Sequence, residues 1–529
     1  MKEEVPLLKR QRTRRRYHFL GAVVVGALSG WVAVGFQIAL KTAEQWRETL
    51  IATLSGPGGW GLWAIPVLAA GIISLVAWVT RAACPAAAGS GIPHLKGVLL
   101  GVRVMDGLRL LAVKFVGGVL AIGAGLSLGR EGPTVQMGGA IGQQVGLRMG
   151  REGDSGAILI AVGAGAGLSA AFNAPLAGFL FVMEELHFEF APLPYISALA
   201  ASITADTLSR AVSGQLPVFL VFRHSTPPLP MLPWFAGIGV VAGLLAILFK
   251  TSLLKGLRLS EQRGPTGQVA LPIAAGVIGA LAAIWFPEIA GSGHRMAEDL
   301  LNSNIPSSDG FRLVLAMLAG KFALTVLSYL AKVPGGIFAP MLAIGGAMGY
   351  GLGLLQGWLF PGWGLSPAVS AVVGMASFFS GVVHAPLTGI ALILEMTSNF
   401  NLLFPMMLAT VVAFSISESF GGQPVYEALL NEDLAKHGPP PLLFQEPVHL
   451  HLLVEERSEL VGKPLSQLGM PEGVLFVSVN RRGHKFVPGG GTILVPGDAL
   501  EIMISGEVGP WTTEILDMAK ATEEAGNSS

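Results

Sequence analysis

Long apolar segments alternate with short polar connections through most of the chain. The first runs from about Phe19 to Leu40 and reaches the length of roughly 20 residues that a helix needs to cross a hydrocarbon core. Further long segments lie near residues 62–80, 109–128, 156–172, 193–212, 232–250, 269–286, 311–330, 338–358 and 402–419. This pattern predicts an all-α polytopic membrane protein.

Four other apolar segments are too short, or too interrupted by glycine and proline, to span a membrane cleanly. They lie near residues 134–148, 174–187, 366–380 and 384–396. Broken helices at membrane depth are tolerated only where they are buried in protein or line a watery cavity. The interrupted segments therefore favour a pathway for an ion or solute over a simple membrane anchor.

The last part of the chain has a different character. Residues 438–529 are rich in charge and contain no membrane-length apolar run. Alternation at Val448–Val454 indicates a strand. Further β-rich runs lie at Val474–Val479, Lys485–Val487 and Asp498–Ile504, and a short helical stretch at Ser458–Leu468. We expect a small soluble α/β domain over residues 447–518, after a linker at 431–446 and before a flexible tail at 519–529.

The apolar part contains an internal repeat. Lys114-Phe115 and Lys321-Phe322 lie 207 residues apart, and nearby prolines and glycines match at the same offset. Two further pairs match in the same order: residues 173–178 with 384–389 and, more weakly, 89–91 with 291–293. The matches indicate a duplicated membrane unit, with repeats of about 18–212 and 232–430 inside a membrane domain of residues 18–430.

Such a duplication bears on the site. Transporter repeats place the substrate site at their interface, on the ends of half-helices. The residues leave open whether the second repeat is inverted relative to the first. We interpret Lys114 and Lys321 as structural charges that form pairs and hold helices together.

Composition and charge narrow the function classes. The chain has 529 residues, of which 52% are hydrophobic and 13% charged, against about 25% charged in soluble domains. The 34 basic and 34 acidic residues balance, so no net charge points to a nucleic-acid partner. Cys84 is the only cysteine, which excludes an intramolecular disulfide and a multi-cysteine metal site.

Motifs and the N-terminus complete this picture. No Walker loop, HExxH motif, nucleophile elbow or zinc spacing occurs in the sequence. We therefore expect neither an enzyme nor a requirement for a metal or cofactor. Residues 1–17 carry seven basic side chains, which predicts a cytoplasmic N-terminal arm ahead of a retained helix.

One candidate site is the loop Gly129–Pro133, which reads Gly-Arg-Glu-Gly-Pro and precedes segment 134–148. Proline suits a first helical turn, and the glycines leave backbone amides open. Unpaired N–H groups at the positive end of a helix dipole form an anion site, and partial charges let the anion leave again. Gly335–Pro340 is the corresponding element of the second half. Two such N-termini converging on one point would form an anion pathway that needs no lysine.

Glu131 admits two interpretations. A carboxylate beside an anion site can occupy that site as a tethered competitor. Protonation would release it and so link anion movement to proton movement. Alternatively, Glu131 forms a local ion pair with Arg130 that closes the loop, because ionisable residues within spans are often paired.

Four further residues also allow an unremarkable interpretation. Ser90, within Gly89–Pro93, offers a hydroxyl at a break between segments or simply caps a helix. Glu184 and Glu185 end an apolar run and lie at the water interface, unless one faces the interior and accepts protons. Tyr426 follows the last long apolar run, where an interfacial tyrosine is the default.

Together these motifs resemble those of one family. The segments Gly89–Pro93, Gly129–Pro133 and Gly335–Pro340 look like the three signature motifs of the CLC family of chloride channels and transporters, and residues 173–178 and 385–389 match as well. The resemblance covers roughly residues 18–430. It implies the CLC fold, a homodimer with one pathway per subunit and two inverted repeats with broken helices.

The resemblance also implies residue roles. By position, Glu131 resembles the external gating glutamate and Glu185 the internal proton-transfer glutamate, which accompanies proton-coupled exchange in this family. Ser90 and Tyr426 resemble the hydroxyl donors to the central chloride, and a serine at position 90 resembles the chloride-preferring members. The remaining chloride-binding positions are Ile337, Phe338, Gly129, Arg130 and Gly132, through their backbone amides.

The expected function follows from this resemblance. It is a chloride/proton antiporter among the lipids of a bacterial inner membrane, with both termini in the cytoplasm and only chloride and protons as transported ions. A passive chloride channel on the same scaffold is the alternative, and a receptor or a cation-coupled carrier is a more distant one. Residues 447–518 resemble the C-terminal subdomain of RCK-type regulators of potassium transport, which implies a regulatory or dimerising module with a small ligand.

Overall fold

The computed structural model describes residues 6–55, 60–151, 153–186, 192–219, 226–302, 310–437, 448–455, 458, 460–470, 474–481 and 484–504. The chain divides into two compact units, Met1–Glu432 and Asp433–Ser529, and each is considered by itself. The start of the predicted N-terminal arm, residues 438–446 of the predicted linker, residues 505–518 of the predicted C-terminal domain and the predicted tail lie outside the described residues.

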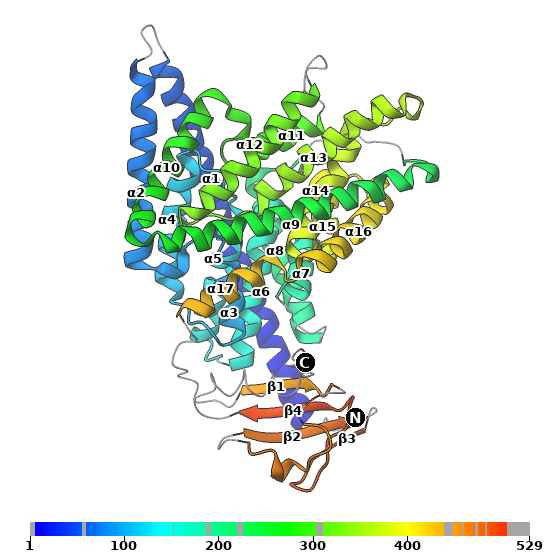
Figure 1. Cartoon of the computed structure of the whole chain (residues 1–529). Helices are drawn as coiled ribbons and strands as arrows, with labels where there is room; N and C mark the ends of the chain where they lie inside the picture. Colours follow the sequence, from blue (N-terminus) through cyan, green and yellow to red (C-terminus); the bar gives the residue numbers. More distant parts are fainter. Residues whose placement is uncertain are drawn as a thin grey trace, which may run out of the picture. The chain divides into compact units, whose positions relative to one another are not determined.

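The membrane unit is a bundle of helices (Figure 1). Its first half contains α1 (Pro6–Leu54), α2 (Ala64–Ala83), α3 (Ile92–Leu99), α4 (Gly107–Gly123), α5 (Glu131–Arg148), α6 (Gly153–Phe172), α7 (Pro175–Glu184) and α8 (Pro192–Ser213). Its second half contains α9 (Leu232–Gln262), α10 (Gly264–Trp285), α11 (His294–Leu301), α12 (Gly310–Leu330), α13 (Phe338–Leu359), α14 (Pro367–Val383), α15 (Pro386–Thr397), α16 (Leu403–Gly421) and α17 (Val425–His437). Each apolar segment of the sequence falls on one of these helices.

The predicted polytopic membrane architecture is confirmed. Within the described ranges, eight helices are long and apolar enough to cross a membrane. Helices α4 and α8, predicted as long apolar segments near 109–128 and 193–212, are not among the eight. Helix α4 has only 17 residues, and α8 carries polar side chains that include the ion pair of Asp206 and Arg210 at 2.7 Å.

The hydrophobic pattern does not predict three of the helices, α3, α11 and α17. Helices α3 and α11 have eight residues each, too few for a periodic signal. Each follows a glycine in the left-handed conformation, Gly91 with φ 84° and Gly293 with φ 88°, which a residue with a side chain rarely adopts. Helix α17 covers residues 431–437, which the sequence analysis assigns to the linker.

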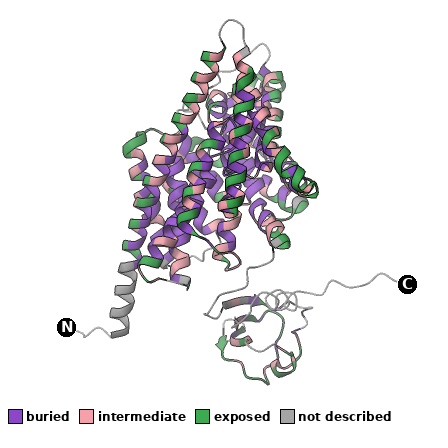
Figure 2. Cartoon of the chain, turned by 90° about the vertical axis from the view of Figure 1, so that its left-hand side faces the viewer, coloured by how far each residue is buried: buried purple, intermediate pink, exposed green. Residues whose placement is uncertain are grey.

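The buried core runs through the middle of the bundle (Figure 2). In the spans of α6 and α13, 83% and 78% of the residues are buried, against 39% in α2. Such burial requires close helix packing, which glycine permits. A Cβ on Gly345 would lie 2.6 Å from the carbonyl oxygen of Gly374, and a Cβ on Gly138 would run into that of Gly163. Gly138 and Gly345 are 207 residues apart, so both halves pack by the same device.

The duplication extends to two buried lysines. Lys114 Nζ donates to the carbonyl oxygens of Gly89 (2.7 Å) and Ala87 (3.0 Å). Lys321 Nζ likewise donates to the carbonyl oxygens of Gly291 (2.7 Å) and Ile289 (3.0 Å). The prediction that these lysines form charge pairs is therefore wrong. They satisfy carbonyl groups that the loops before α3 and α11 turn into the core.

Helices α7 and α15 cap each other. Glu395, near the end of α15, accepts hydrogen bonds from two amides in the first turn of α7 (2.8 and 3.0 Å). Glu184, at the end of α7, accepts hydrogen bonds from two amides in the first turn of α15 (2.7 and 3.0 Å). Carboxylates suit the positive end of a helix dipole. Because each helix end meets the start of the other, the two helices run antiparallel, as expected of halves with inverted topology.

The C-terminal unit contains a four-stranded antiparallel sheet in the order β1-β4-β2-β3. The strands are β1 (Val448–Leu453), β2 (Val474–Arg481), β3 (His484–Phe486) and β4 (Ala499–Ile504). Their buried face joins Leu452, Val479, Leu500 and Ile502 in one small core. The predicted strands are confirmed.

The predicted helical stretch Ser458–Leu468 is wrong over most of its length. Only Leu465–Gln467 forms a short 3-10 helix. Gly462 adopts a left-handed conformation with φ 78°, and Pro464 lacks the N–H that a helix interior needs. The segment instead makes isolated bridges to residues 493–494, so the part of this unit that the structure describes is built on a sheet.

Candidate functional site

Two helices begin at the same place inside the membrane unit, α5 at Glu131 and α13 at Phe338. Ahead of them, the N–H of Gly129 donates to the carbonyl oxygen of Gly336 (2.6 Å), and the N–H of Gly336 donates to that of Gly129 (2.8 Å). The first amides of a helix lack an intrahelical acceptor and carry the positive end of its dipole. The structure thus brings together the two N-termini that the sequence pairs, including the amides of Ile337 and Phe338.

Two buried hydroxyl groups lie at this junction. Ser90 and Tyr426 are fully buried, and the Tyr426 hydroxyl lies close to Ser90. A Cβ on Gly132 would be 2.6 Å from Ser90 Oγ, so this hydroxyl adjoins the start of α5. Among the described residues, neither hydroxyl has a hydrogen-bond partner. Buried hydroxyls usually have one, so the helix starts, where these two hydroxyls lie beside each other, lack an acceptor.

The unremarkable interpretations of these two residues are wrong. The N-cap of α3 is Gly91, and no side chain caps this helix, so Ser90 is not a helix cap. Tyr426 has no exposed surface, so it is not an interfacial tyrosine. The last long apolar helix is followed by a turn that returns α17 and its tyrosine to the core.

Glu131 lies beside the same junction. Its side chain is 3% exposed, and Oε1 is 3.8 Å from Arg130 Nε. Oε2 has no hydrogen-bond partner among the described residues. A Cβ on Gly129 would run into this oxygen and would lie 3.1 Å from the amide nitrogen of Ala339 in α13. The carboxylate therefore lies over the two helix starts, and the long contact with Arg130 leaves one oxygen facing them.

The two glutamates that end the α7 segment have different environments. Glu184 caps α15, as described above. Glu185 is the C-cap residue of α7 and is 3% exposed. Of the two, Glu185 alone offers an interior carboxylate that is not used in capping a helix.

Sequence reasoning missed the partners of Glu185. Lys96 Nζ, from α3, is 3.0 Å from Glu185 Oε1 and 3.2 Å from Glu427 Oε1 of α17. The available signal was a lysine within the apolar run after Pro93. Its two carboxylates lie 89 and 331 positions away in the chain, so no local pattern reveals the cluster.

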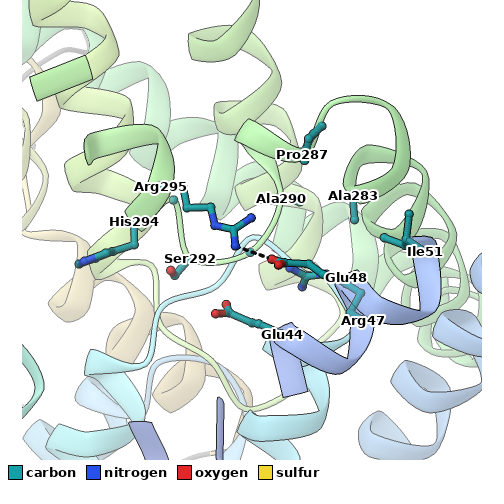
Figure 3. Close-up of a pocket in the computed structure, with 12 residues that line it drawn as sticks. Glu44, Arg47, Glu48, Ile51, Ala283, Pro287, Ala290, Ser292, His294 and Arg295 are labelled. Carbon is teal, nitrogen blue, oxygen red and sulfur yellow. Dashed lines mark ion pairs between the residues drawn. The ribbon is translucent and has the colours of Figure 1, made fainter. Parts of the chain in front are cut away.

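A polar pocket of about 80 Å³ opens between α1 and the start of α11 (Figure 3). Its titratable lining residues are Glu44, Arg47, Glu48, His294 and Arg295. Arg295 pairs with Glu48 at 2.7 Å, and Arg130 lies within electrostatic range of Glu44. The loop Gly291–Gly293, the second copy of Gly89–Gly91, forms one wall. The hydrophobic pattern gives no indication of this pocket, although the charges near the end of the first apolar helix are a signal for it.

The C-terminal unit has a hollow of its own, of about 340 Å³, over its sheet. Polar side chains line it: Ser478, Asn480, Lys485 and Glu501. Glu501 Oε2 accepts hydrogen bonds from Ser478 Oγ (2.8 Å) and Lys485 Nζ (2.7 Å). In the part of the chain that the structure describes, no group of three His, Cys, Asp or Glu residues could hold a metal ion.

Two family models match the chain. The model described as voltage gated chloride channel matches residues 70–418, and the model described as TrkA-C domain matches residues 451–507. The H(+)/Cl(-) exchange transporter ClcA of Vibrio campbellii (strain ATCC BAA-1116) is 34% identical over 426 residues, which are 78% of this chain and 89% of that protein. The ClcA of Salmonella arizonae is 35% identical over 425 residues, 79% of this chain and 89% of that protein.

Solved structures agree. A slow cyanobacterial Cl-/H+ antiporter has 34% sequence identity and a TM-score of 0.76, over 79% of this chain and 98% of that chain. A CLC-type fluoride/proton antiporter, at 23% identity and a TM-score of 0.63 over 78% of this chain and 98% of that chain, shares the fold. The paired helix starts, the internal duplication and these matches lead to one conclusion: the chain belongs to the CLC family of voltage-gated chloride channels and carries a C-terminal TrkA-C domain.

Proposed function

We propose that this protein moves chloride across a membrane in exchange for protons. The observation that carries the proposal is the junction of two helix N-termini with two unpartnered buried hydroxyls and one buried carboxylate. Helix starts and hydroxyls attract an anion, and a carboxylate at the same place makes its passage depend on protonation. The names of the similar ClcA proteins, which are H(+)/Cl(-) exchange transporters, support the same function.

Chloride binds through partial charges. Ser90 and Tyr426 donate their hydroxyl groups, and the amides of Ile337 and Phe338 donate from the start of α13. The loop before α5 adds the amides of Gly129, Arg130 and Gly132. Partial charges hold an anion weakly enough for it to leave, whereas a lysine at the site would trap it.

Glu131 is the gate and the outer proton carrier. When ionised, its carboxylate competes with chloride for the positive helix starts. When it binds a proton it loses that attraction, swings away and admits chloride. The unpartnered Oε2 supports this role, because a carboxylate fixed by a tight ion pair could not leave its place.

Glu185 is the inner proton acceptor. It is buried at the end of α7, and the Tyr426 hydroxyl of the chloride site lies within its electrostatic range. A proton taken up from the inner solution is then passed toward Glu131. No metal, nucleotide or enzymatic step takes part.

The setting of the transporter is also proposed. The protein lies in the inner membrane of a bacterial cell, and the basic residues 1–17 support an N-terminus in the cytoplasm. Exposed apolar side chains such as Trp31, Trp78 and Leu248 contact lipid. The protein works as a homodimer, as the resemblance to the family implies. The domain over residues 447–518 is cytoplasmic and regulates transport by binding a small ligand, for which the hollow over its sheet offers space.

Proton flux in liposomes tests the function. Purified protein is reconstituted, a chloride gradient is imposed, and the external pH is recorded with and without a voltage clamp. We expect chloride to drive protons uphill, and Glu131→Gln and Glu185→Gln each to abolish proton movement. Glu184→Gln is the matched control, because Glu184 only caps α15, and it retains coupling. Chloride flux without proton movement in the wild type would identify a channel instead.

A further inference from the structure

Lys96 contacts the inner proton site from the helix that follows Ser90. It belongs to α3, which begins two residues after Ser90. Its ammonium nitrogen is 3.0 Å from Glu185 and 3.2 Å from Glu427. The Lys96 and Glu185 side chains are both 4% exposed, whereas that of Glu427 is 33% exposed. One buried ammonium therefore joins a buried carboxylate at the end of α7 to a partly exposed carboxylate on α17.

We propose that Lys96 is a positioning residue that sets the proton affinity of Glu185 and links proton uptake there to the chloride ligand Tyr426. This inference rests on the exchange function proposed above and assigns it a further residue.

The charges around Glu185 explain the first part of the proposal. The charged groups that act on it are Lys96 on α3, Glu427 on α17 and Glu184 on its own helix. Lys96 is the only cation among these three. A neighbouring positive charge favours the ionised form of a carboxylate, and a neighbouring negative charge favours the protonated form. Because the contact with Lys96 is buried, water screens it little.

The position of Glu427 explains the second part. Glu427 directly follows Tyr426 in the first turn of α17. When a proton from the inner solution binds Glu185, this carboxyl group becomes neutral, while Lys96 keeps its contact with Glu427. The balance of forces on the first turn of α17 then changes, and the Tyr426 hydroxyl is on that turn. Proton uptake at Glu185 thus affects the chloride site.

The cluster is not a remnant of the duplication. At the offsets that relate the two halves, Lys96 corresponds to Glu298 and Glu185 to Met396. The second half therefore has no equivalent ion pair at these positions. A contact needed only to pack the scaffold would be expected in both halves, as the lysine contacts with the loops before α3 and α11 are.

The test uses the full-length protein in liposomes. Proton-coupled chloride flux is measured at a series of internal pH values, and the pH of half-maximal proton flux is compared between variants. Lys96→Gln removes the ammonium, so Glu185 binds protons more readily and the half-point rises by about 1 to 3 pH units. Glu427→Gln removes one of the two carboxylates that contact Lys96. Glu185 then has one negative neighbour fewer and binds protons less readily, so the half-point falls. Opposite shifts from two members of one cluster would not arise from loosened packing.

Two further variants distinguish an effect of the Lys96 charge on Glu185 from an effect of Lys96 on how firmly α17 is held. Arg258→Gln removes another ion pair to α17, that of Arg258 with Glu432, without touching Glu185, and it leaves the half-point unchanged. Lys96→Arg keeps the positive charge and restores the half-point toward the wild-type value. If Arg258→Gln shifts the half-point as Lys96→Gln does, anchoring of α17 is the cause and the proposal is overturned.

The outcomes also distinguish a failure of the proposed exchange function from a failure of the proposed role of Lys96. Absence of proton flux in the wild type contradicts the exchange function itself. Coupled flux with the same half-point in wild type, Lys96→Gln and Glu427→Gln contradicts the role of Lys96 alone. If Lys96→Gln does not fold, Glu427→Gln and Lys96→Arg decide the question, because an unchanged half-point in Glu427→Gln overturns the proposal.

Discussion

In the first half of the membrane unit Lys114 holds the loop before α3, and in the second half Lys321 holds the loop before α11 by hydrogen bonds of the same lengths. Helices α7 and α15 likewise exchange carboxylate caps. The two carboxylates proposed to carry protons do not repeat. At the offsets that relate the halves, Glu131 corresponds to Phe338 and Glu185 to Met396.

The difference has a physical reason. The two halves meet at one anion site, and each contributes one helix start to it. Contacts that fix the backbone must be kept in both halves, because both helix starts have to be held in place. A second gating carboxylate at position 338 would put two negative charges beside one anion and would raise the cost of ionising either. Proton coupling therefore depends on positions where the two copies diverged.

The largest effect is expected from removing the shared lysines. Both Lys114→Met and Lys321→Met keep the apolar stem. Lys321→Met leaves two buried carbonyl oxygens without a donor, whereas Lys114→Met leaves one, because the carbonyl oxygen of Gly89 also accepts the N–H of Gly335 (3.0 Å). Each oxygen without a donor costs about 1 to 3 kcal/mol. We expect both variants to lose stability, Lys321→Met the more, measured as the melting temperature in detergent. A large loss of stability in one variant and none in the other would contradict the view that both halves depend on the same lysine contact.

A smaller and one-sided effect is expected from the repeated serines. Ser90→Ala removes a hydrogen bond to a charged ligand, worth about 1.5 kcal/mol or roughly a tenfold loss of chloride affinity. Ser292→Ala, at the equivalent position, leaves chloride affinity unchanged. Isothermal titration of chloride into both purified variants checks this. Equal losses would mean that the second copy also binds the anion.

The smallest effect is expected from the reciprocal caps. Glu184→Gln and Glu395→Gln each keep one acceptor oxygen but lose the charge that suits a helix start, which costs about 0.3 to 1 kcal/mol. Both variants should melt slightly and equally below the wild type, with proton coupling retained. Loss of coupling in Glu184→Gln at normal stability would mean that Glu184 takes part in proton transfer.

The sequence alone predicts the bundle and the first half of the site. The hydrophobic pattern finds the long helices, and the glycines and proline around Glu131 identify a helix start that is open to an anion. The match between Gly129–Pro133 and Gly335–Pro340 predicts that a second helix start joins it. These signals are local or repeated, so they can be read along the chain.

The remaining features depend on contacts that the chain forms over long distances. Lys96 meets Glu185 and Glu427 only because α3, α7 and α17 are packed together. Tyr426 follows the last long apolar helix and is expected at the interface, until α17 turns it inward. In the C-terminal unit, Gly462 and Pro464 break a stretch whose composition favours a helix. In the first two cases tertiary structure overrides the local pattern, whereas Gly462 and Pro464 are local signals against the predicted helix.

The position of a bound halide tests the central claim most directly. Crystals of the full-length protein grown in bromide would reveal the ion through its anomalous scattering. We predict bromide between the hydroxyls of Ser90 and Tyr426 and the amides of Ile337 and Phe338, and a second bromide at the Glu131 carboxylate position in Glu131→Gln. Bromide bound only elsewhere, for example at Arg47 in the pocket of Figure 3, would contradict the account.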